Sequence, residues 1–185
     1  MNDFTSQSNL PPVKRYVARA LDELPIEAEI RAQIRERRRQ GCFREVADLF
    51  QSTIHQFGDL PELYFYVGRA WSKLQEYQQA CAAFTEAVRI EPGYAEAQSD
   101  LGLMYILLKE YETGDLHLRK AIALSPQDPI VWGRLALSLD EQGRINEAID
   151  AIRQAIQLDP AQPGPHRHLD ILMGKLRSTE QRLTN

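Results

Sequence analysis

Residues that could perform chemistry are few and scattered in this sequence. The histidines and cysteines are His55, His117, His166, His168, Cys42 and Cys81. His166 and His168 are two positions apart, so on a helix they point to different faces and cannot easily share one metal ion. No histidine can be assigned as a base for either cysteine, and no H-E-x-x-H or C-x-x-C motif occurs. We therefore expect no catalytic residues, no metal site and no cofactor.

Composition excludes several further classes of protein. The 185 residues are 43% hydrophobic and 26% charged, which is typical of a folded chain and too apolar for a disordered one. The net charge of -4 does not favour nucleic acid as a partner. The longest apolar run, Tyr105 to Leu108, is too short to cross a bilayer, and the first residues lack the pattern of a signal peptide. We expect a cytoplasmic protein with reduced thiols.

The sequence repeats itself with a period of 34 residues. The prolines that mark the repeat are Pro92, Pro126 and Pro160. Five residues before each proline lies an alanine: Ala87, Ala121 and Ala155. Three residues before each alanine lies a large apolar residue: Phe84, Leu118 and Ile152. A fixed period of this length is typical of stacked supersecondary units, each of which buries its apolar face against its neighbours.

The apolar pattern of each unit predicts a pair of helices. Its first half, such as LYFYVGRAWSKL, places apolar residues at i, i+3, i+4 and i+7, and its second half, such as ACAAFTEAVRI, is again helical in period. A short polar turn joins the halves, and the proline ends the second helix. Small residues let the paired helices approach closely, while large ones fill the space between pairs.

These units resemble tetratricopeptide repeats, whose pattern is W-x2-L-G-x2-Y, then A-x3-F-x2-A and a final proline. The unit 61–94 carries Tyr64, Val67, Gly68, Trp71, Ala80, Phe84, Ala87 and Pro92. The unit 95–128 departs from the pattern at Gln98, where an aromatic residue is usual, and at Gly114, where alanine is usual. The resemblance implies an all-α, right-handed α-solenoid of helix-turn-helix repeats, with N- and C-terminal capping helices.

The repeat register divides the chain. Counting back one period from 61 gives a degenerate unit that keeps Gly41, Phe43, Val46 and Phe50. We expect a flexible N-terminus at 1–10, an N-terminal capping helix at 11–26, the degenerate repeat at 27–60, repeats at 61–94, 95–128 and 129–162, a C-terminal capping helix at 163–177 and a flexible tail at 178–185.

The resemblance also implies a binding surface, because the first helix of each repeat lines the concave groove in this family. The expected partner-binding residues are Phe65, Tyr66, Arg69, Lys73, Ser99, Leu103, Ile106, Leu107, Arg134 and Leu137. Leu103, Ile106 and Leu107 form an apolar stripe that packing within the array does not require. Either a protein partner covers this stripe, or the array covers it with its own N-terminal segment or a second copy.

A group of arginines forms the second feature of the groove. We expect a basic wall of Arg31, Arg35, Arg38 and Arg39, continued by Arg69 and Lys73. Such a wall suits an acidic peptide or a C-terminal carboxylate; the alternative is a solvated face that pairs locally with glutamates. The clamp by which some family members grip heat-shock chaperone tails is not expected, because only Arg134 fits it and Asp100 would repel a carboxylate.

Together these features predict a non-enzymatic adaptor or scaffold that binds a peptide or helical segment of a protein partner, without a small-molecule substrate. The alternative is a small chaperone of the secretion or assembly type, which shields apolar segments of its clients and can act as a homodimer. Apolar anchors at Leu103, Leu107 and Phe65 would serve either role.

Overall fold

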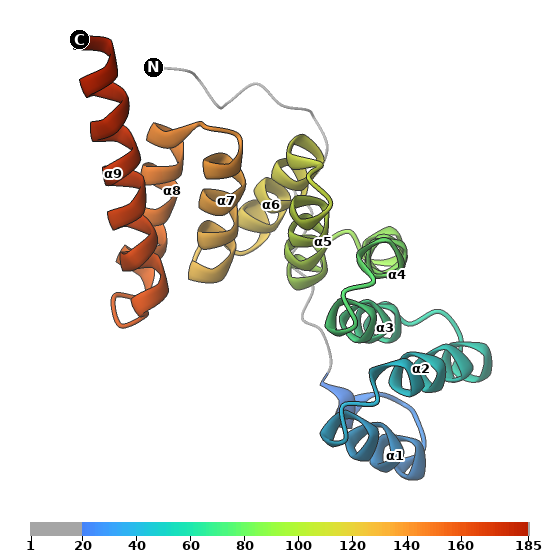
Figure 1. Ribbon diagram of the computed structural model, residues 1–185. Helices are drawn as coiled ribbons and strands as arrows, with labels where there is room; N and C mark the ends of the chain where they lie inside the picture. Colours follow the sequence, from blue (N-terminus) through green and yellow to red (C-terminus); the bar gives the residue numbers. More distant parts are fainter. Residues whose placement is uncertain (1–19, 185) are drawn as a thin grey trace.

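The computed structural model describes the chain from residue 20 to residue 184. All secondary structure in this part of the chain is helical, and it contains no strand. After a 3-10 turn at Leu21–Glu23, the helices are α1 (Ala28–Arg39), α2 (Phe43–Phe57), α3 (Pro61–Lys73), α4 (Tyr77–Ile90), α5 (Ala95–Leu107), α6 (Tyr111–Leu124), α7 (Pro129–Glu141), α8 (Ile145–Leu158) and α9 (Pro163–Thr184). Each helix packs on the next, which gives the curved stack of Figure 1. Helices α3, α5 and α7 follow the inner side of the bend, and α4 lies on its outer side.

The turns inside the helix pairs repeat with the same period as the sequence. A left-handed residue follows the first helix of each pair at Gly41, Gln75, Lys109 and Gly143. In each turn, the next backbone N–H donates to a carbonyl five residues earlier, as Glu76 does to Trp71 at 3.1 Å. Glycine suits this conformation best, because it has no Cβ to clash. The presence of this turn at Gly41 supports placing 27–60 in the same register as the three clear repeats.

Prolines set the boundaries between the pairs. Helix α4 ends at Ile90, two residues before Pro92, and α6 and α8 end at the same distance from their prolines. Proline also occupies the first position of α3, α7 and α9, where its missing N–H would have no partner within the helix.

Small residues of one helix receive large residues of the next, as the pattern predicts. A Cβ added at Gly68 would lie 2.7 Å from the ring of Phe84, so α3 and α4 can approach only because this position has no side chain. Gly102 meets Leu118 in the same way, and its added Cβ would also lie 3.0 Å from the backbone oxygen of Gly114. The interior is therefore a continuous row of interlocking helix pairs.

The repeat 95–128 has Gln98 where an aromatic residue is usual, and this glutamine pairs with His117. Gln98 is buried and its Oε1 lies 2.8 Å from Nδ1 of His117, whose ring stacks on Tyr105. In the flanking repeats the same two positions hold Tyr64 with Ala83 and Trp132 with Ala151, a large residue opposite a small one. The glutamine and histidine fill comparable space and share a hydrogen bond, while Gln98 Nε2 donates to the Pro92 carbonyl.

This pair makes stability depend on pH. Burial, assisted by the charge of Lys120, lowers the pKa of His117 from 6.5 to about 4. The unfolded chain therefore binds the proton more tightly, so the stability that His117 contributes is present above pH 6.5 and is lost as the pH falls towards 4. We expect a loss of about 2 kcal/mol at pH 5 relative to pH 7. Urea denaturation at both pH values measures it, and His117→Gln should remove this component; an equal pH dependence in the variant would contradict the assignment.

Both ends of the array differ from the expectation. Helix α9 continues to Thr184 rather than ending at 177, because no glycine or proline interrupts its last turns. It is attached to α7 through Asp140, which accepts hydrogen bonds from His168 at 3.1 Å and Lys175 at 2.5 Å. At the other end, residues 1–10 and most of the expected capping helix 11–26 lie outside the described residues. Its last part contains a 3-10 turn, which ends at Glu23 because Leu24, the residue before Pro25, is extended.

Candidate functional site

Two of the residues expected to face the groove belong to the core. Ile106 is only 5% exposed and packs with Leu118 and Val131 between helix pairs. Phe65 is 7% exposed, and its ring lies 5.7 Å from that of Phe84 and 4.9 Å from that of Tyr94. The expectation that both side chains face the groove, and that Phe65 anchors a partner there, was wrong, because neighbouring helices of the same chain already cover them.

The rest of the apolar stripe is partly exposed. Leu107, in the last position of α5, is 43% exposed, and Leu103 one turn earlier is half-buried against the core. Leu137 is half-buried on α7, which contacts α5. Ile130, in the first turn of α7, is 54% exposed. The inner helices thus present separate apolar side chains rather than a broad apolar floor.

Ser99 and Arg134 are used within the protein. The Arg134 guanidinium donates to Ser99 Oγ at 2.6 Å and forms an ion pair with Asp100 at 2.7 Å. Ser99 itself is buried. This contact joins α5 to α7 and neutralises the cation, so the structure does not offer Arg134 or Ser99 to a ligand as the sequence led us to expect.

Most of the expected basic wall is also paired locally. Arg31 donates to the backbone oxygens of Leu24 at 3.1 Å and Ile26 at 2.7 Å, so it fixes the chain that leads into α1 and does not belong to a wall. Arg35 pairs with Asp22, and Arg39 pairs with Glu36 at 3.0 Å. Only Arg39 pairs with a glutamate, as the alternative expected, whereas Arg31 and Arg35 are held by the chain that precedes α1.

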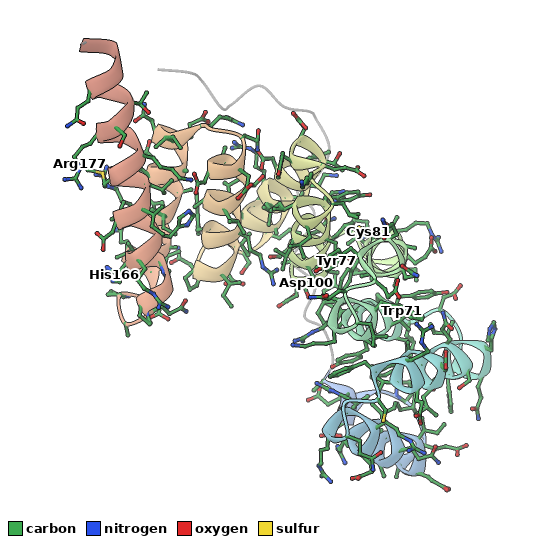
Figure 2. All side chains as sticks on the ribbon, viewed as in Figure 1. Trp71, Tyr77, Cys81, Asp100, His166 and Arg177 are labelled. Atoms are coloured by element: carbon green, nitrogen blue, oxygen red, sulfur yellow. The ribbon has the colours of Figure 1, made fainter. Side chains whose placement is uncertain are left out.

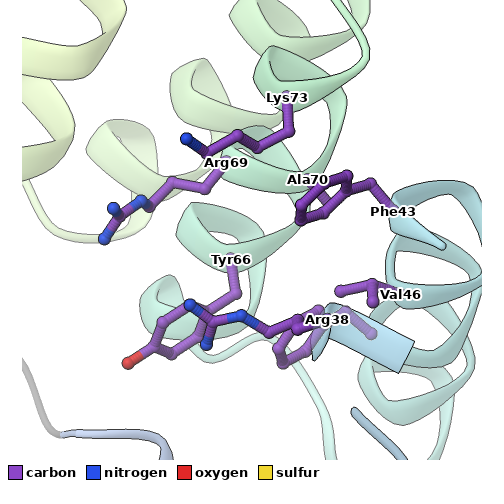
Figure 3. Close-up of a pocket in the computed structure, with 8 residues that line it drawn as sticks. Arg38, Phe43, Val46, Tyr66, Arg69, Ala70 and Lys73 are labelled. Atoms are coloured by element: carbon purple, nitrogen blue, oxygen red, sulfur yellow. The ribbon is translucent and has the colours of Figure 1, made fainter. Parts of the chain in front are cut away.

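Arg38 differs from its neighbours, because it faces a pocket between α1, α2 and α3. The pocket is small and open to solvent. Figure 3 shows Arg38 from α1 and Arg69 and Lys73 from α3 extending towards the same side of it. The residues that line it are Arg38, Phe43, Val46, Phe50, Tyr66, Arg69, Ala70 and Lys73. This pocket brings together three of the six expected basic residues. A more open hollow shares Arg38, Phe43 and Lys73 with it and is also lined by Arg35 and Arg39, which are paired locally.

None of the three cations is paired with a carboxylate in the part of the chain that the structure describes. The Arg69 guanidinium lies 5.6 Å from the centre of the Phe65 ring, a cation–π contact that holds its position without neutralising its charge. Lys73 and Arg38 are exposed. The pocket is thus a locally positive site in a chain whose net charge is negative.

Tyr66 forms one wall of this pocket. Its ring stacks on Phe50, with centres 5.2 Å apart and planes 11° apart. Burial raises the pKa of the Tyr66 phenol, although a hydrogen bond from the Leu21 backbone and the charges of Arg38 and Arg69 oppose the rise. The phenol therefore stays protonated at neutral pH and can donate a hydrogen bond.

Phe43 and Phe50 line the same pocket but were not among the expected site residues. Both lie on α2, whereas the sequence argument considered only the first helix of each repeat. Phe43 comes directly after the hairpin turn, at the position that Tyr77, Tyr111 and Ile145 occupy in the other repeats. The recurrence of a large apolar residue at this position is the sequence feature that points to Phe43.

Among the described residues no hydrogen bond joins a cysteine to a histidine. Figure 2 shows Cys81 on α4 and His166 at the start of α9, in distant parts of the stack. Burial raises the pKa of the Cys81 thiol to about 11, so it stays protonated and behaves as a packing residue. Among the described residues no three metal-ligating side chains gather at one place, and no helix combines the length and apolar composition that crossing a bilayer requires.

Comparisons with known proteins agree with the architecture. Models of the tetratricopeptide repeat match residues 61–94, 95–128 and 129–162. The peroxisomal targeting signal receptor of Candida albicans is 32% identical over 81 residues, which are 42% of this chain and 14% of that receptor. This chain therefore corresponds to a small part of that curated relative.

Solved structures show the same fold. MamA from Desulfovibrio magneticus superposes with a TM-score of 0.75 at 22% identity, covering 83% of this chain and 86% of that one. The first TPR of Spaghetti (RPAP3), bound to the HSP90 peptide SRMEEVD, gives a TM-score of 0.62 at 16% identity, covering 63% of this chain and 93% of that one. At these identities the likeness concerns the fold alone.

Proposed function

The chain belongs to the tetratricopeptide repeat family, and we propose that it is a non-enzymatic protein-interaction module, an adaptor that holds a segment of a partner protein on the inner side of its helical stack. The observation that carries this proposal is the exposure of apolar side chains on inner helices. Leu107 of α5 is 43% exposed and Ile130 of α7 is 54% exposed. Neither contributes to the buried core, so packing of the array does not explain them.

The preformed array suits this role. Its helices are held by neighbours along the whole stack, so little ordering of the receptor is needed when a segment binds. The Spaghetti (RPAP3) structure, in which a domain of the same fold holds a peptide, supports a peptide or helix as the bound element. The residues that the heat-shock chaperone clamp requires are not matched here, so we propose a segment of different chemistry.

A binding experiment with two matched variants tests the proposal. The immobilised protein is used to retain partners from a native lysate, alongside Leu107→Asp and the control Leu116→Asp. Leu116 is 53% exposed on α6, so it offers similar chemistry outside the inner helices. We expect the wild type and Leu116→Asp to retain the same protein and Leu107→Asp to lose it, with unchanged melting temperatures.

The retained protein is then divided into fragments, and the affinity of the shortest binding fragment is measured for the same three proteins. A fragment that binds all three equally would contradict the proposed surface. Light scattering is run alongside, because a wild-type dimer that only Leu107→Asp breaks would indicate that a second copy covers the inner face. That outcome would favour the chaperone-like alternative in place of an adaptor.

A further inference from the structure

We propose that the pocket between α1, α2 and α3 binds the acidic side chains of a protein segment, with an apolar residue of that segment beside them. Its cations are Arg38, Arg69 and Lys73, and its apolar walls include Phe43 and Tyr66. This inference rests on the proposed function in one respect, since the ligand is taken to be part of a partner protein. It adds the chemistry of the segment and the place where it is recognised.

Arg38 differs from its neighbours in the last turn of α1. Arginines in the last turn of a helix favour its negative end, so their presence alone needs no ligand. Arg37, however, pairs with Glu45 at 3.0 Å and Arg39 pairs with Glu36 at 3.0 Å, whereas Arg38 has no carboxylate among the described residues. Of the three arginines in the last turn of α1, only Arg38, which faces the pocket, has no carboxylate partner within the described part of the chain.

Positively charged side chains from two repeats meet at this pocket. Arg69 and Lys73 are one turn apart on α3, and both line the same pocket as Arg38 from the preceding repeat. Three cations at one place repel one another, and an anion bound among them would relieve this repulsion. A guanidinium and an ammonium together can contact the oxygens of two adjacent carboxylates or of one phosphorylated side chain.

The walls of the pocket add a preference for a protein segment. The side chains of Phe43, Val46 and Phe50 are apolar, and the Tyr66 ring stacks on Phe50. An apolar side chain next to the acidic group would cover these walls and reduce the water around the ion pairs, which strengthens them.

The surroundings of the pocket argue against nucleic acid. A phosphodiester chain extends its charge over many nucleotides and needs a continuous basic track. Here the neighbouring arginines are neutralised by Asp22, Glu36 and Glu45, and the next inner cation, Arg134, is neutralised by Asp100. The positive charge therefore stops at the edges of the pocket, which suits a short acidic stretch.

Fluorescence anisotropy with short synthetic peptides tests the proposal. The probe is a labelled, C-terminally amidated peptide with Phe-Glu-Glu at its centre, compared with analogues that carry Phe-Gln-Gln and Phe-phosphoserine. The variant Arg38→Gln/Lys73→Gln removes two pocket charges. The control Arg89→Gln/Lys120→Gln removes two exposed charges from α4 and α6, outside the pocket.

We expect the wild type and the control to bind Phe-Glu-Glu at least about 10-fold more tightly than Phe-Gln-Gln, and the pocket variant to lose this difference. Tighter binding of the phosphoserine peptide would support the same site with a phosphorylated side chain as the anion. Equal binding of the acidic and neutral peptides, an equal loss in the control, or a single-stranded oligonucleotide that binds more tightly than any peptide would overturn the proposal.

The same peptides separate this inference from the proposed function. Leu107 lies on α5, outside the pocket, so Leu107→Asp should bind Phe-Glu-Glu as the wild type does. If peptide binding fails while Leu107→Asp still loses the partner, only the pocket is refuted. If peptide binding depends on Arg38 and Lys73 while Leu107→Asp keeps the partner, the proposed inner apolar surface is refuted and the pocket stands.

Discussion

Replacing Phe84 by alanine is expected to lower the free energy of unfolding by about 3–5 kcal/mol, the range for removing a fully buried aromatic side chain. The ring is 1% exposed and packs against Phe65 at 5.7 Å. It also covers the backbone of α3 at Gly68, a contact so close that a Cβ on the glycine would lie 2.7 Å from it. Truncation would leave a cavity between two helices that cannot collapse without losing their register.

Urea denaturation followed by circular dichroism measures this loss. Gln78→Ala is the matched control, because Gln78 lies on the same helix and is exposed, so its replacement should change stability by less than about 0.5 kcal/mol. Since each pair of helices is stabilised by its neighbours, the Phe84→Ala transition should also broaden. Equal midpoints for Phe84→Ala and Gln78→Ala would show that the repeat register is misplaced.

The repeat architecture could be predicted because its determinants are local and recur. Gly68 and Phe84, or Ala136 and Ile152, are a small residue and a large one at a fixed spacing, and the structure places each such pair in the core. The prolines end the helices where the pattern predicted. These choices depend on neighbours within one or two repeats, which the period itself makes visible.

The groove was harder to predict, because exposure depends on which helix pairs approach most closely. Ile106 was expected on the inner surface, yet it is buried where Gly114 replaces the usual alanine. A Cβ added at Gly114 would lie 3.1 Å from Cγ1 of Ile106. In the other repeats the corresponding pairs are Ser72 with Ala80 and Asp140 with Ala148. The departure at Gly114 is visible in the sequence, but the close approach of Ile106 that it permits appears only in the folded structure.

The basic wall shows a second limit of sequence reasoning. Arg31 and Arg35 share one side of α1 with Arg38, and their spacing alone treats them as equivalent. Their partners, the carbonyls of Leu24 and Ile26 and the carboxylate of Asp22, come from the irregular chain that precedes α1. An irregular segment has no period, so its contacts appear only in the folded structure.

Ile106 is buried and its neighbour Leu107 is exposed, so an aspartate should affect stability very differently at the two positions. Ile106→Asp is expected to lower the free energy of unfolding by about 4 kcal/mol or more, because it places an unpaired carboxylate in a space that is filled by apolar groups. Leu107→Asp should lower it by less than about 1 kcal/mol, since that side chain is 43% exposed at the end of α5.

The two variants carry the same charge one residue apart, so net charge and helix propensity cancel in the comparison and burial remains. Chemical denaturation of both proteins at neutral pH gives the two free energies directly. A folded, stable Ile106→Asp would mean that α5 is rotated relative to α6 and α7, and that Ile106 belongs to the inner surface with Leu103 and Leu107. Loss of folding in Leu107→Asp would instead place the whole stripe in the core, and the partner surface would then have to be sought at the pocket of Arg38, Arg69 and Lys73.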